Sequence, residues 1–463
     1  MPREISSPNS SRETTIKGRV THMEDKNQTA RFDTFEQRVP ANHWTKSNFG
    51  AKGWVMIVFV GLMLMFCSGL SNDGLNVAVP VIAAEKGWDY ATILAYSTPA
   101  GFISVVGTWL VAVLTDKKGA RFTTILCLVI TGITYIWYGN AASMTQYFIA
   151  LSLISTFATG MAWVSGGAYL ASYFPKKKGL ALGWATMGNN LCTAIFVPIL
   201  NTLTGKMGMS GAVIPIGIAI LLLIIFTVFL PNNPEDAGTT PDQIPMDKSE
   251  IEDYRRAANS YVSPWTTKTL IRCKEMWLIS LVLGCTMLIT VGIVGQLVVR
   301  LTGDFGWEQG KAVSTMSVCA VIGIVGSYLW GVIDQKIGTK KAVFAYMIWY
   351  GIAAFLNAIP NTAALYVSLV MIGVAIGGNA NWPVSLVSTV FGYRNFSRVY
   401  TLVMPIYTLI RCCAFAVLAG FMSMTGSLSG AYIAFGVLGL LGAVLTLFID
   451  DKRFADGTLG DLA

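Results

Sequence analysis

Histidine and charged residues are both scarce in this sequence. Only two histidines occur, His22 and His43, and both lie in the polar N-terminal segment. No histidine is therefore available inside an apolar segment as a metal ligand or proton carrier. Charged residues make up 13% of the 463 residues and hydrophobic residues 54%, whereas soluble domains carry about 25% charged residues. This balance excludes an ordinary soluble domain and indicates a chain that crosses a membrane several times.

Motifs of nucleotide-dependent and metal-dependent enzymes are missing as well. No GxGxxG opens a helix after a strand, no P-loop occurs, and none of the eight cysteines forms a CxxC pair. We interpret the cysteines as small hydrophobic residues, because most of them lie inside apolar runs. We therefore expect no enzymatic reaction, no cofactor, no metal and no use of ATP. Residues 1–48 lack the apolar stretch of a signal peptide, and we expect them to form a flexible cytoplasmic tail.

Twelve apolar segments are long enough to cross a bilayer. We expect them at about 53–82, 91–115, 121–140, 146–173, 180–203, 211–230, 276–301, 311–333, 342–359, 364–391, 399–422 and 429–449. The sequence thus predicts an all-α membrane protein made of two pseudo-symmetric six-helix bundles. Its predicted parts are an N-terminal tail (1–50), a first bundle (51–231), a polar linker (232–275), a second bundle (276–451) and a C-terminal tail (452–463).

The short loops between these segments differ in charge. Loops 2–3, 4–5, 8–9 and 10–11 hold eleven lysines and arginines, whereas the opposite loops hold little beyond three lysines. Basic loops stay on the cytoplasmic side of a membrane, so this pattern places both termini and the linker in the cytoplasm. The net charge of +8 is spread over these clusters, which argues against a nucleic-acid-binding face.

The two halves repeat each other at an offset of 219 residues. Trp88 of "EKGWDYATI" pairs with Trp307 of "DFGWEQGKA", and Gly119 of "AVLTDKKGAR" pairs with Gly338 of "GVIDQKIGTK". Each landmark lies in the equivalent loop of its half. Parallel six-helix repeats of this kind place a binding site at their interface, near the middle of the membrane.

The stretch "AVLTDKKGAR" resembles the loop 2–3 signature of the major facilitator superfamily, G-x-L-x-D-[RK]-x-G-[RK]-[RK]. The matching residues are Leu114, Asp116, Lys117, Gly119 and Arg121 in the first half and Gly331, Gly338, Lys340 and Lys341 in the second. The resemblance implies the major facilitator fold from about residue 50 to 452. It also implies that the loop acts as a conformational latch, for which we single out Asp116, Gly119, Arg121, Gly338 and Lys340.

Two physical expectations accompany this latch. Asp116 can pair with its neighbour Arg121 or accept hydrogen bonds from a helix N-terminus of the other half. In the second half, Gln335 stands where the signature has an acidic residue. This substitution predicts a latch that works on one side only.

A finer resemblance is to the monocarboxylate and oxalate/formate antiporter branches of this superfamily. It is carried by "GW" before spans 2 and 8, by "FP" and basic residues after span 4, and by "NNPEDAGTTPD" in the linker. These branches carry small carboxylates and use intramembrane Arg or Lys residues, often in spans 8 and 11. Span 8 of this chain has no internal cation, which favours monocarboxylates over dicarboxylates.

Span 11 carries Arg411 in the middle of "PIYTLIRCCAF". A guanidinium near the bilayer centre costs roughly 3 kcal/mol on insertion scales. Tyr407 lies one turn earlier on the same helix face, Met404 continues this stripe, and Pro405 can kink the helix. We expect Arg411 to bind a carboxylate through its planar fork, with Tyr407 as an additional donor; an arginine held by a helix end is the alternative.

Asp73, in "GLSNDGLNVAV", is the one carboxylate well inside a predicted span. Burial in an apolar setting favours its neutral form, so Asp73 is our candidate for proton coupling. Two alternatives stay open at this point. Asp73 can pair with Arg411 when no substrate is bound, or it can already reach water in the outer half of span 1.

Several other residues are candidates for the walls of a binding site. Arg300 and Gln296 lie near the outer end of span 7, where Arg300 either snorkels to the interface or lines an outer vestibule. Spans 1, 4, 7 and 10 line the cavity in this superfamily. The resemblance therefore adds Trp163, Asn379, Asn381 and Trp382 as candidate substrate-binding residues, although each taken singly is a good helix-packing residue.

Together these features predict a secondary transporter of a small organic anion, working by alternating access with proton symport or anion exchange. We expect a monomer in a cell inner membrane whose partners are a carboxylate, protons or a counter-anion, and lipid. A proton-coupled exporter of amphipathic drugs or metabolites is the second possibility, favoured by the many aromatic residues. A membrane sensor or scaffold without transport is the third.

Overall fold

The computed structural model describes residues 38–89, 92–93, 96–454 and 459, and every regular element in them is a helix. Eleven helical stretches are long and apolar enough to cross a membrane, and one of them, Lys178–Phe229, is 52 residues long. That stretch holds two spans, because Gly208 interrupts it with a φ of 69°. A backbone with positive φ suits glycine, which has no Cβ to clash. The prediction of twelve spans in an all-α fold is confirmed.

The N-terminal bundle contains spans 1 to 6, and spans 1, 4 and 5 are interrupted. Its elements are α2 (Gly50–Ser71) and α3 (Leu75–Lys86) in span 1, α5 (Ser97–Lys118) in span 2, α6 (Ala120–Gly139) in span 3, α7 (Met144–Thr159), η2 (Gly160–Ser165) and α8 (Gly166–Tyr173) in span 4, and α9 (Lys178–Ala185), α10 (Met187–Leu191), η3 (Cys192–Phe196) and α11 (Val197–Phe229) in spans 5 and 6. The elements η2 and η3 are π-helical turns.

The C-terminal bundle contains spans 7 to 12. Its elements are α14 (Lys274–Val299) and η6 (Arg300–Asp304) in span 7, α15 (Gln309–Ile337) in span 8, α16 (Thr339–Ala358) in span 9, α17 (Thr362–Asn379) and α18 (Trp382–Phe391) in span 10, α19 (Phe396–Cys412) and α20 (Ala414–Thr425) in span 11, and α21 (Ser429–Leu447) in span 12.

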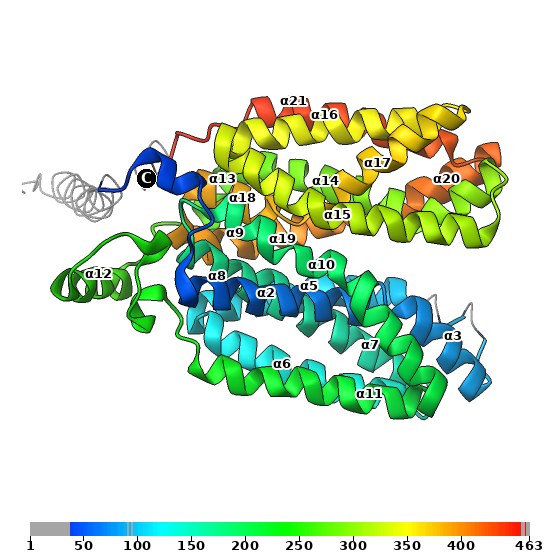
Figure 1. Cartoon of the computed structure of the whole chain (residues 1–463), viewed down its shortest axis with the longest axis horizontal. Coiled ribbons are helices and arrows are strands. Elements are labelled where there is room, and N and C mark those ends of the chain that lie inside the picture. Colours follow the sequence, from blue (N-terminus) through cyan, green and yellow to red (C-terminus); the bar gives the residue numbers. More distant parts are fainter. Residues whose placement is uncertain (1–37, 90–91, 94–95, 455–458, 460–463) are drawn as a thin grey trace, which may run out of the picture.

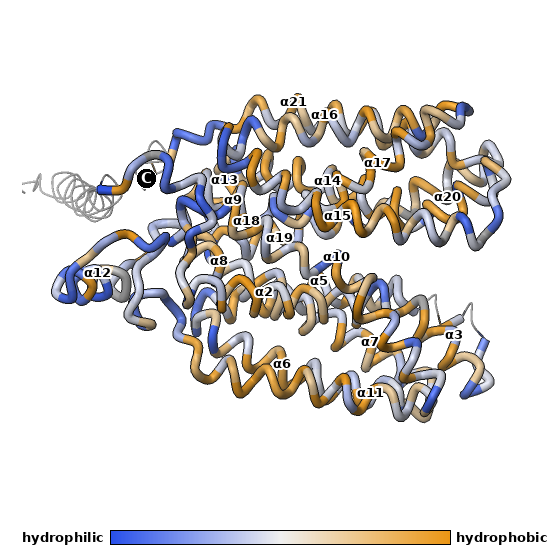
Figure 2. Tube along the Cα trace, viewed as in Figure 1, coloured by the Kyte–Doolittle hydropathy of each residue, from blue (hydrophilic) through white to orange (hydrophobic). Residues whose placement is uncertain are grey.

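The two bundles lie side by side, and the central linker with α12 lies at one end (Figure 1). We call this end, which carries the central linker, the linker side, and the opposite end the far side. Hydrophobic residues follow both bundles along their length, and hydrophilic residues concentrate at the two ends, above all around α12 (Figure 2). The halves pack against each other through α5 with α19, α9 and α10 with α15, and α8 with α18.

Short helices form an ordered layer on the linker side. They are η1 (Ala41–Thr45), η4 (Pro234–Ala237), η5 (Pro241–Gln243), α12 (Lys248–Ser260), α13 (Thr267–Arg272) and η7 (Tyr393–Asn395). Residues 1–37 of the predicted tail lie outside the described residues. Its end and the linker, however, are not loose connectors. Phe49 is 1% exposed and Trp265 2%, because each buries an aromatic ring against the base of its bundle.

The repeat of the sequence is also a repeat of backbone irregularities. Gly119 and Gly338 join spans 2 to 3 and 8 to 9 with φ values of 84° and 85°, so both turns require glycine. Trp382 follows Trp163 by the same 219 residues. Trp163 lies in the π-helical turn of span 4, and Trp382 begins α18 directly after the break in span 10. Equivalent helices are thus interrupted at equivalent depth.

Candidate functional site

Arg411 occupies the last turn of α19, at an interruption of span 11. The helix ends at Cys412, and α20 begins at Ala414 after a single intervening residue. The side chain is half-buried. Within the described residues it forms no hydrogen bond and no ion pair. A half-buried guanidinium with five unused donors is a strong candidate for binding an anion.

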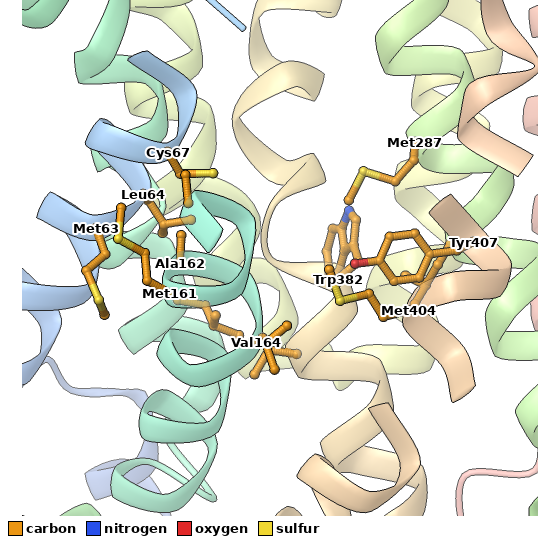
Figure 3. Close-up of a cluster of buried hydrophobic side chains, with 14 of the residues drawn as sticks. Met63, Leu64, Cys67, Met161, Ala162, Val164, Met287, Trp382, Met404 and Tyr407 are labelled. Carbon is orange, nitrogen blue, oxygen red and sulfur yellow. The ribbon is translucent and has the colours of Figure 1, made fainter. Parts of the chain in front are cut away.

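Tyr407 lies one turn before Arg411 and is 4% exposed. Its hydroxyl is 2.8 Å from the hydroxyl of Tyr400, and either oxygen can be the donor. When Tyr400 donates, the Tyr407 O–H remains available for another acceptor. Met404 completes the stripe and lies close to Tyr407 and Trp382 in Figure 3. The predicted face of Arg411, Tyr407 and Met404 is therefore present on α19.

The N-terminal half presents an uncharged surface opposite this face. Figure 3 shows Met63, Leu64 and Cys67 of α2, with Met161 and Ala162 of η2, across from Met287, Trp382 and Tyr407. The Cys67 thiol contacts Thr159 and the half-buried Trp163, and it lies within reach of the charge of Arg411. Trp163 and Arg411 thus belong to one neighbourhood. Nothing in the sequence distinguished Cys67 or Thr159 from membrane-packing residues.

The three predicted residues of span 10 divide into two groups. Asn379 donates to the Met287 sulfur at 3.1 Å, and Trp382 packs edge-on against Trp330 and Tyr346. The Asn379 Oδ1 and Trp382 Nε1 atoms are buried without a hydrogen-bond partner in the described part of the chain. Unsatisfied buried polar atoms are rare in native proteins. Both residues lie beside Met287.

Asn381 belongs to the contact between the halves and not to this region. It is fully buried, accepts from the Thr186 hydroxyl at 2.6 Å and donates to the Ser327 carbonyl at 3.0 Å. Beside it, Asn190 donates to the Ser327 hydroxyl at 3.0 Å. These neutral hydrogen bonds join span 5 to spans 8 and 10 at the middle of the fold. We call them the central seam.

Asp73 lies at the break between α2 and α3, next to the N-terminus of α3. Its carboxylate accepts from the Thr193 hydroxyl at 2.8 Å, and its backbone N–H donates to the Ser68 carbonyl at 2.9 Å. The N-terminal end of a helix favours a negative charge. Arg411 forms no ion pair within the described residues, so Asp73 does not pair with it in this structure.

The latch region connects the halves on the linker side. Asp116 at the end of α5 pairs with Arg398, in the first turn of α19, at 3.2 Å. Arg121 instead binds the Val228 carbonyl within its own half. Of the two predicted arrangements for Asp116, the structure therefore shows contact with the start of a helix of the other half. Lys340 is half-buried next to the Gly338 turn.

The second half also carries a carboxylate in this region, although Gln335 stands at the acidic position of the signature. Asp334, one residue before the position of Gln335, is 3% exposed and accepts a hydrogen bond from Ser385. Lys178, at the start of α9, acts on its charge from the other half. Asp334 and Lys178 therefore mirror Asp116 and Arg398. The motif comparison missed this because the carboxylate is displaced by one residue, which turns it inward on α15.

Arg300 does not snorkel to the interface, because its side chain is only 1% exposed. It pairs with Asp304, and it donates to the Ser429 hydroxyl at 2.7 Å and the Asn357 carbonyl at 2.7 Å. A cavity of about 330 Å³ opens beside Arg300 and Asp304 on the far side of the C-terminal bundle. Gln296 is half-buried at a kink of α14. Arg300 thus serves as a packing centre for spans 7, 9 and 12.

The sequence profile described as "Major Facilitator Superfamily" matches residues 61–414. Because this match covers most of the chain, the protein belongs to that superfamily. Monocarboxylate transporter 12 of Homo sapiens is 21% identical over 372 residues, which cover 78% of this chain and 69% of that protein. The oxalate:formate antiporter of Oxalobacter formigenes is 23% identical over 372 residues, covering 75% and 79%.

Solved structures support the same fold. The proton:xylose symporter XylE bound to 6-bromo-6-deoxy-D-glucose aligns with a TM-score of 0.69 at 13% identity, covering 89% of this chain and 98% of that one. The human organic anion transporter MFSD10 aligns with a TM-score of 0.60 at 16% identity, covering 88% and 100%. At such identities the likeness establishes the fold alone. The chain is a multi-pass membrane protein of a transporter family.

Proposed function

We propose that this protein is a secondary active transporter of a small organic anion, specifically a monocarboxylate. Arg411 anchors the carboxylate and Tyr407 adds a donor. The observation that carries the proposal is the half-buried Arg411 guanidinium, which has no hydrogen-bond or ion-pair partner within the described residues. A structural arginine at this depth would have its donors occupied, as Arg300 has. The named activities of the monocarboxylate and oxalate:formate relatives are consistent with this anchor.

The charge of the site favours one carboxylate rather than two. Arg411 faces the uncharged side chains of Cys67 and Trp163, and span 8 supplies no second cation. A dicarboxylate would leave one anionic group without a partner in a poorly solvated region, at a large free-energy cost. Asn379 and Trp382, with their unsatisfied polar atoms, are the other proposed contacts.

Binding of a carboxylate is tested with purified protein and a panel of monocarboxylates and dicarboxylates in a thermal-shift assay. Arg411→Ala removes charge-assisted hydrogen bonds worth roughly 1.5–3 kcal/mol, so affinity should fall about 10- to 150-fold. Arg411→Lys keeps the charge but loses the fork and should lie between the two. Arg272→Ala, which removes an exposed arginine of α13, is the matched control. Full ligand stabilisation and full uptake by Arg411→Ala would refute the anchor.

Asp73 is the proposed proton-coupling residue. Its carboxylate is held by Thr193 in an interrupted part of span 1, where unwound backbone commonly accompanies coupling sites in transporters. In proteoliposomes, Asp73→Asn should retain carboxylate binding but lose the acceleration of uptake by an imposed pH gradient. Asp253→Asn changes an aspartate whose side chain is 73% exposed and should behave like the wild type. If Asp73→Asn responds to the gradient as the wild type does, the chain exchanges anions or couples protons elsewhere.

A further inference from the structure

The central linker is anchored to the N-terminal half at the start of span 5. The Asp242 carboxylate accepts from the backbone N–H groups of Lys176 and Lys177 at 2.7 and 2.9 Å. Asp242 is 1% exposed and has a φ of 54°, a conformation that residues other than glycine rarely adopt. Its carbonyl contacts the His43 ring at 3.1 Å. The surrounding contacts therefore hold this part of the linker in a defined position.

The same linker is anchored to the C-terminal half just before span 11. The Tyr254 hydroxyl of α12 is 2.8 Å from the Tyr393 hydroxyl of η7. Tyr261 and Ser263 both donate to the Asn395 side-chain carbonyl, at 3.0 and 2.6 Å. The linker thus ends in a second fixed contact and spans the gap between the loops before α9 and α19.

These two loops are equivalent in the repeat, and both must move when the linker side opens. The helices that follow them, α9 and α19, carry Lys178 and Arg398, which face carboxylates of the opposite half. Opening the linker side separates each helix from the half it faces. A linker fixed to both loops opposes that separation.

Glu235 lies within this bridge and is 7% exposed. It interacts with Tyr173 at the end of α8 in one half and with Arg394 of η7 in the other. Asp236, which pairs with Arg255 at 2.8 Å, is its other charged neighbour. The phenol of Tyr254 also faces Glu235. Glu235 Oε2 is buried without a hydrogen-bond partner in the described part of the chain, so a negative charge on it is poorly solvated.

We propose that the central linker is a releasable strap that keeps the linker side closed, and that protonation of Glu235 tightens it. This proposal does not depend on the identity of the substrate or on Arg411. It adds to the transporter a control by the pH on the linker side, which the charge pattern of the loops places in the cytoplasm.

The direction of the pH effect follows from proton linkage. Burial raises the pKa of Glu235 from its usual 4.5 to about 7, although the charge of Arg394 opposes this. Once the strap is released, Glu235 meets water and its pKa returns toward the usual value. The closed state therefore binds the proton more tightly, so acid favours closure and closure weakens as the pH rises through about 7.

Lys177 does not alter this direction between pH 6 and 8. Burial lowers its pKa from 10.5 to about 8, and its ammonium contacts His43 and Asn48. Release would let Lys177 return toward its usual pKa. Its contribution to closure therefore changes only as the pH rises above about 8, where loss of the proton favours the closed state.

The strap is tested with nitroxide labels at Lys118→Cys and Lys336→Cys, two exposed positions at the linker-side ends of spans 2 and 8. The full chain is used, with Cys412 and Cys413 replaced by serine. Electron–electron distance distributions in lipid nanodiscs give the ratio of separated to close labels at pH 6 and 8. The wild-type ratio should rise up to about tenfold between these pH values, the change expected for one group with closed and open pKa values of about 7 and 4.5.

Three variants separate the strap from other causes of a pH response. Glu235→Gln should keep the ratio as low at pH 8 as at pH 6. Glu252→Gln, on the same linker but 72% exposed, should respond as the wild type does. Tyr254→Phe removes the bond to Tyr393, so the ratio should rise at both pH values while the pH response remains. A full pH response in Glu235→Gln, or an unchanged ratio in Tyr254→Phe, overturns the proposal.

Discussion

The buried Arg300 and the half-buried Arg411 show how the same residue type takes opposite parts in one fold. Arg300 is surrounded by Asp304, Asn357 and Ser429, whereas Arg411 has no hydrogen-bonding or ionic partner within the described residues. Each guanidinium loses contact with water, which costs free energy. For Arg300, its ion pair and hydrogen bonds within the protein offset this cost. For Arg411 no such compensation occurs among the described residues.

Removing the anionic partner of Arg300 should destabilise the fold. Asp304→Ala leaves a guanidinium that is 1% exposed without its anion, and the fold should lose about 3 kcal/mol of unfolding free energy. Thermal unfolding in detergent should show a lower midpoint, whereas Asp253→Ala, on an exposed face, should leave it unchanged. An unchanged midpoint in Asp304→Ala would mean that Asn357 and Ser429 suffice to hold Arg300.

The sequence singles out residues whose chemistry is unusual for a membrane and passes over those whose chemistry is ordinary. Arg411 stands out from its sequence because a charge at that depth is costly. Cys67 does not, since thiols are common in apolar helices. Asp334 was overlooked because motif spacing assigned its place to Gln335, and only the rotation of α15 shows which side chain points inward.

At the scale of elements, hydropathy predicted the spans but not their interruptions. The twelve segments and the Gly119 turn follow from composition and from the positive φ that only glycine adopts easily. The break after Ser71, the π-helical turns η2 and η3, and the junction at Cys413 do not. Hydropathy reports contact with lipid, whereas the continuity of a spanning helix depends on tertiary packing. The 219-residue spacing of Trp163 and Trp382 was the available signal for two of these sites.

These interruptions carry the polar residues of the candidate site. Asp73 follows the end of α2, Trp163 lies in η2, Asn379 closes α17, and Arg411 stands in the last turn of α19. A broken helix exposes backbone groups that need partners, and such partners are ligands, water or neighbouring side chains. Candidate residues from distant parts of the sequence thus share one structural setting, the interruption of a spanning helix.

At the scale of the whole molecule, α9 and α15 meet through backbone. A Cβ placed on Gly183 would lie 3.0 Å from the Ser327 carbonyl oxygen, and one on Gly331 would collide with the Gly179 carbonyl and lie 2.9 Å from the Gly183 Cα. These glycines allow the halves to approach closely on the linker side. Together with the central seam, the Asp116–Arg398 ion pair and the attraction between Asp334 and Lys178, they define the closed face.

Gly331→Ala should therefore act as a wedge. Its methyl group meets backbone, which cannot rotate away, so the closed linker side should lose about 1–3 kcal/mol relative to the open form. The nitroxide pair at positions 118 and 336 should shift toward longer distances at both pH values. Gly420→Ala adds a methyl group that meets nothing within 4 Å and should have no effect. An unshifted distribution in Gly331→Ala would show that the helices can tilt apart without opening the face.

The glycine contact between α9 and α15 also bears on how readily substitutions can change the balance between the closed and open forms. When two halves rock, side chains at their contact must change rotamers and partners, and this rearrangement adds to the energy barrier. A contact between glycine backbones needs little side-chain rearrangement. The stability of the closed contact therefore depends mainly on the side-chain volume at Gly179, Gly183 or Gly331. A series from glycine through alanine to valine at one of these positions should shift the balance from the closed toward the open linker side in steps, without changing the proposed contacts Arg411 and Tyr407.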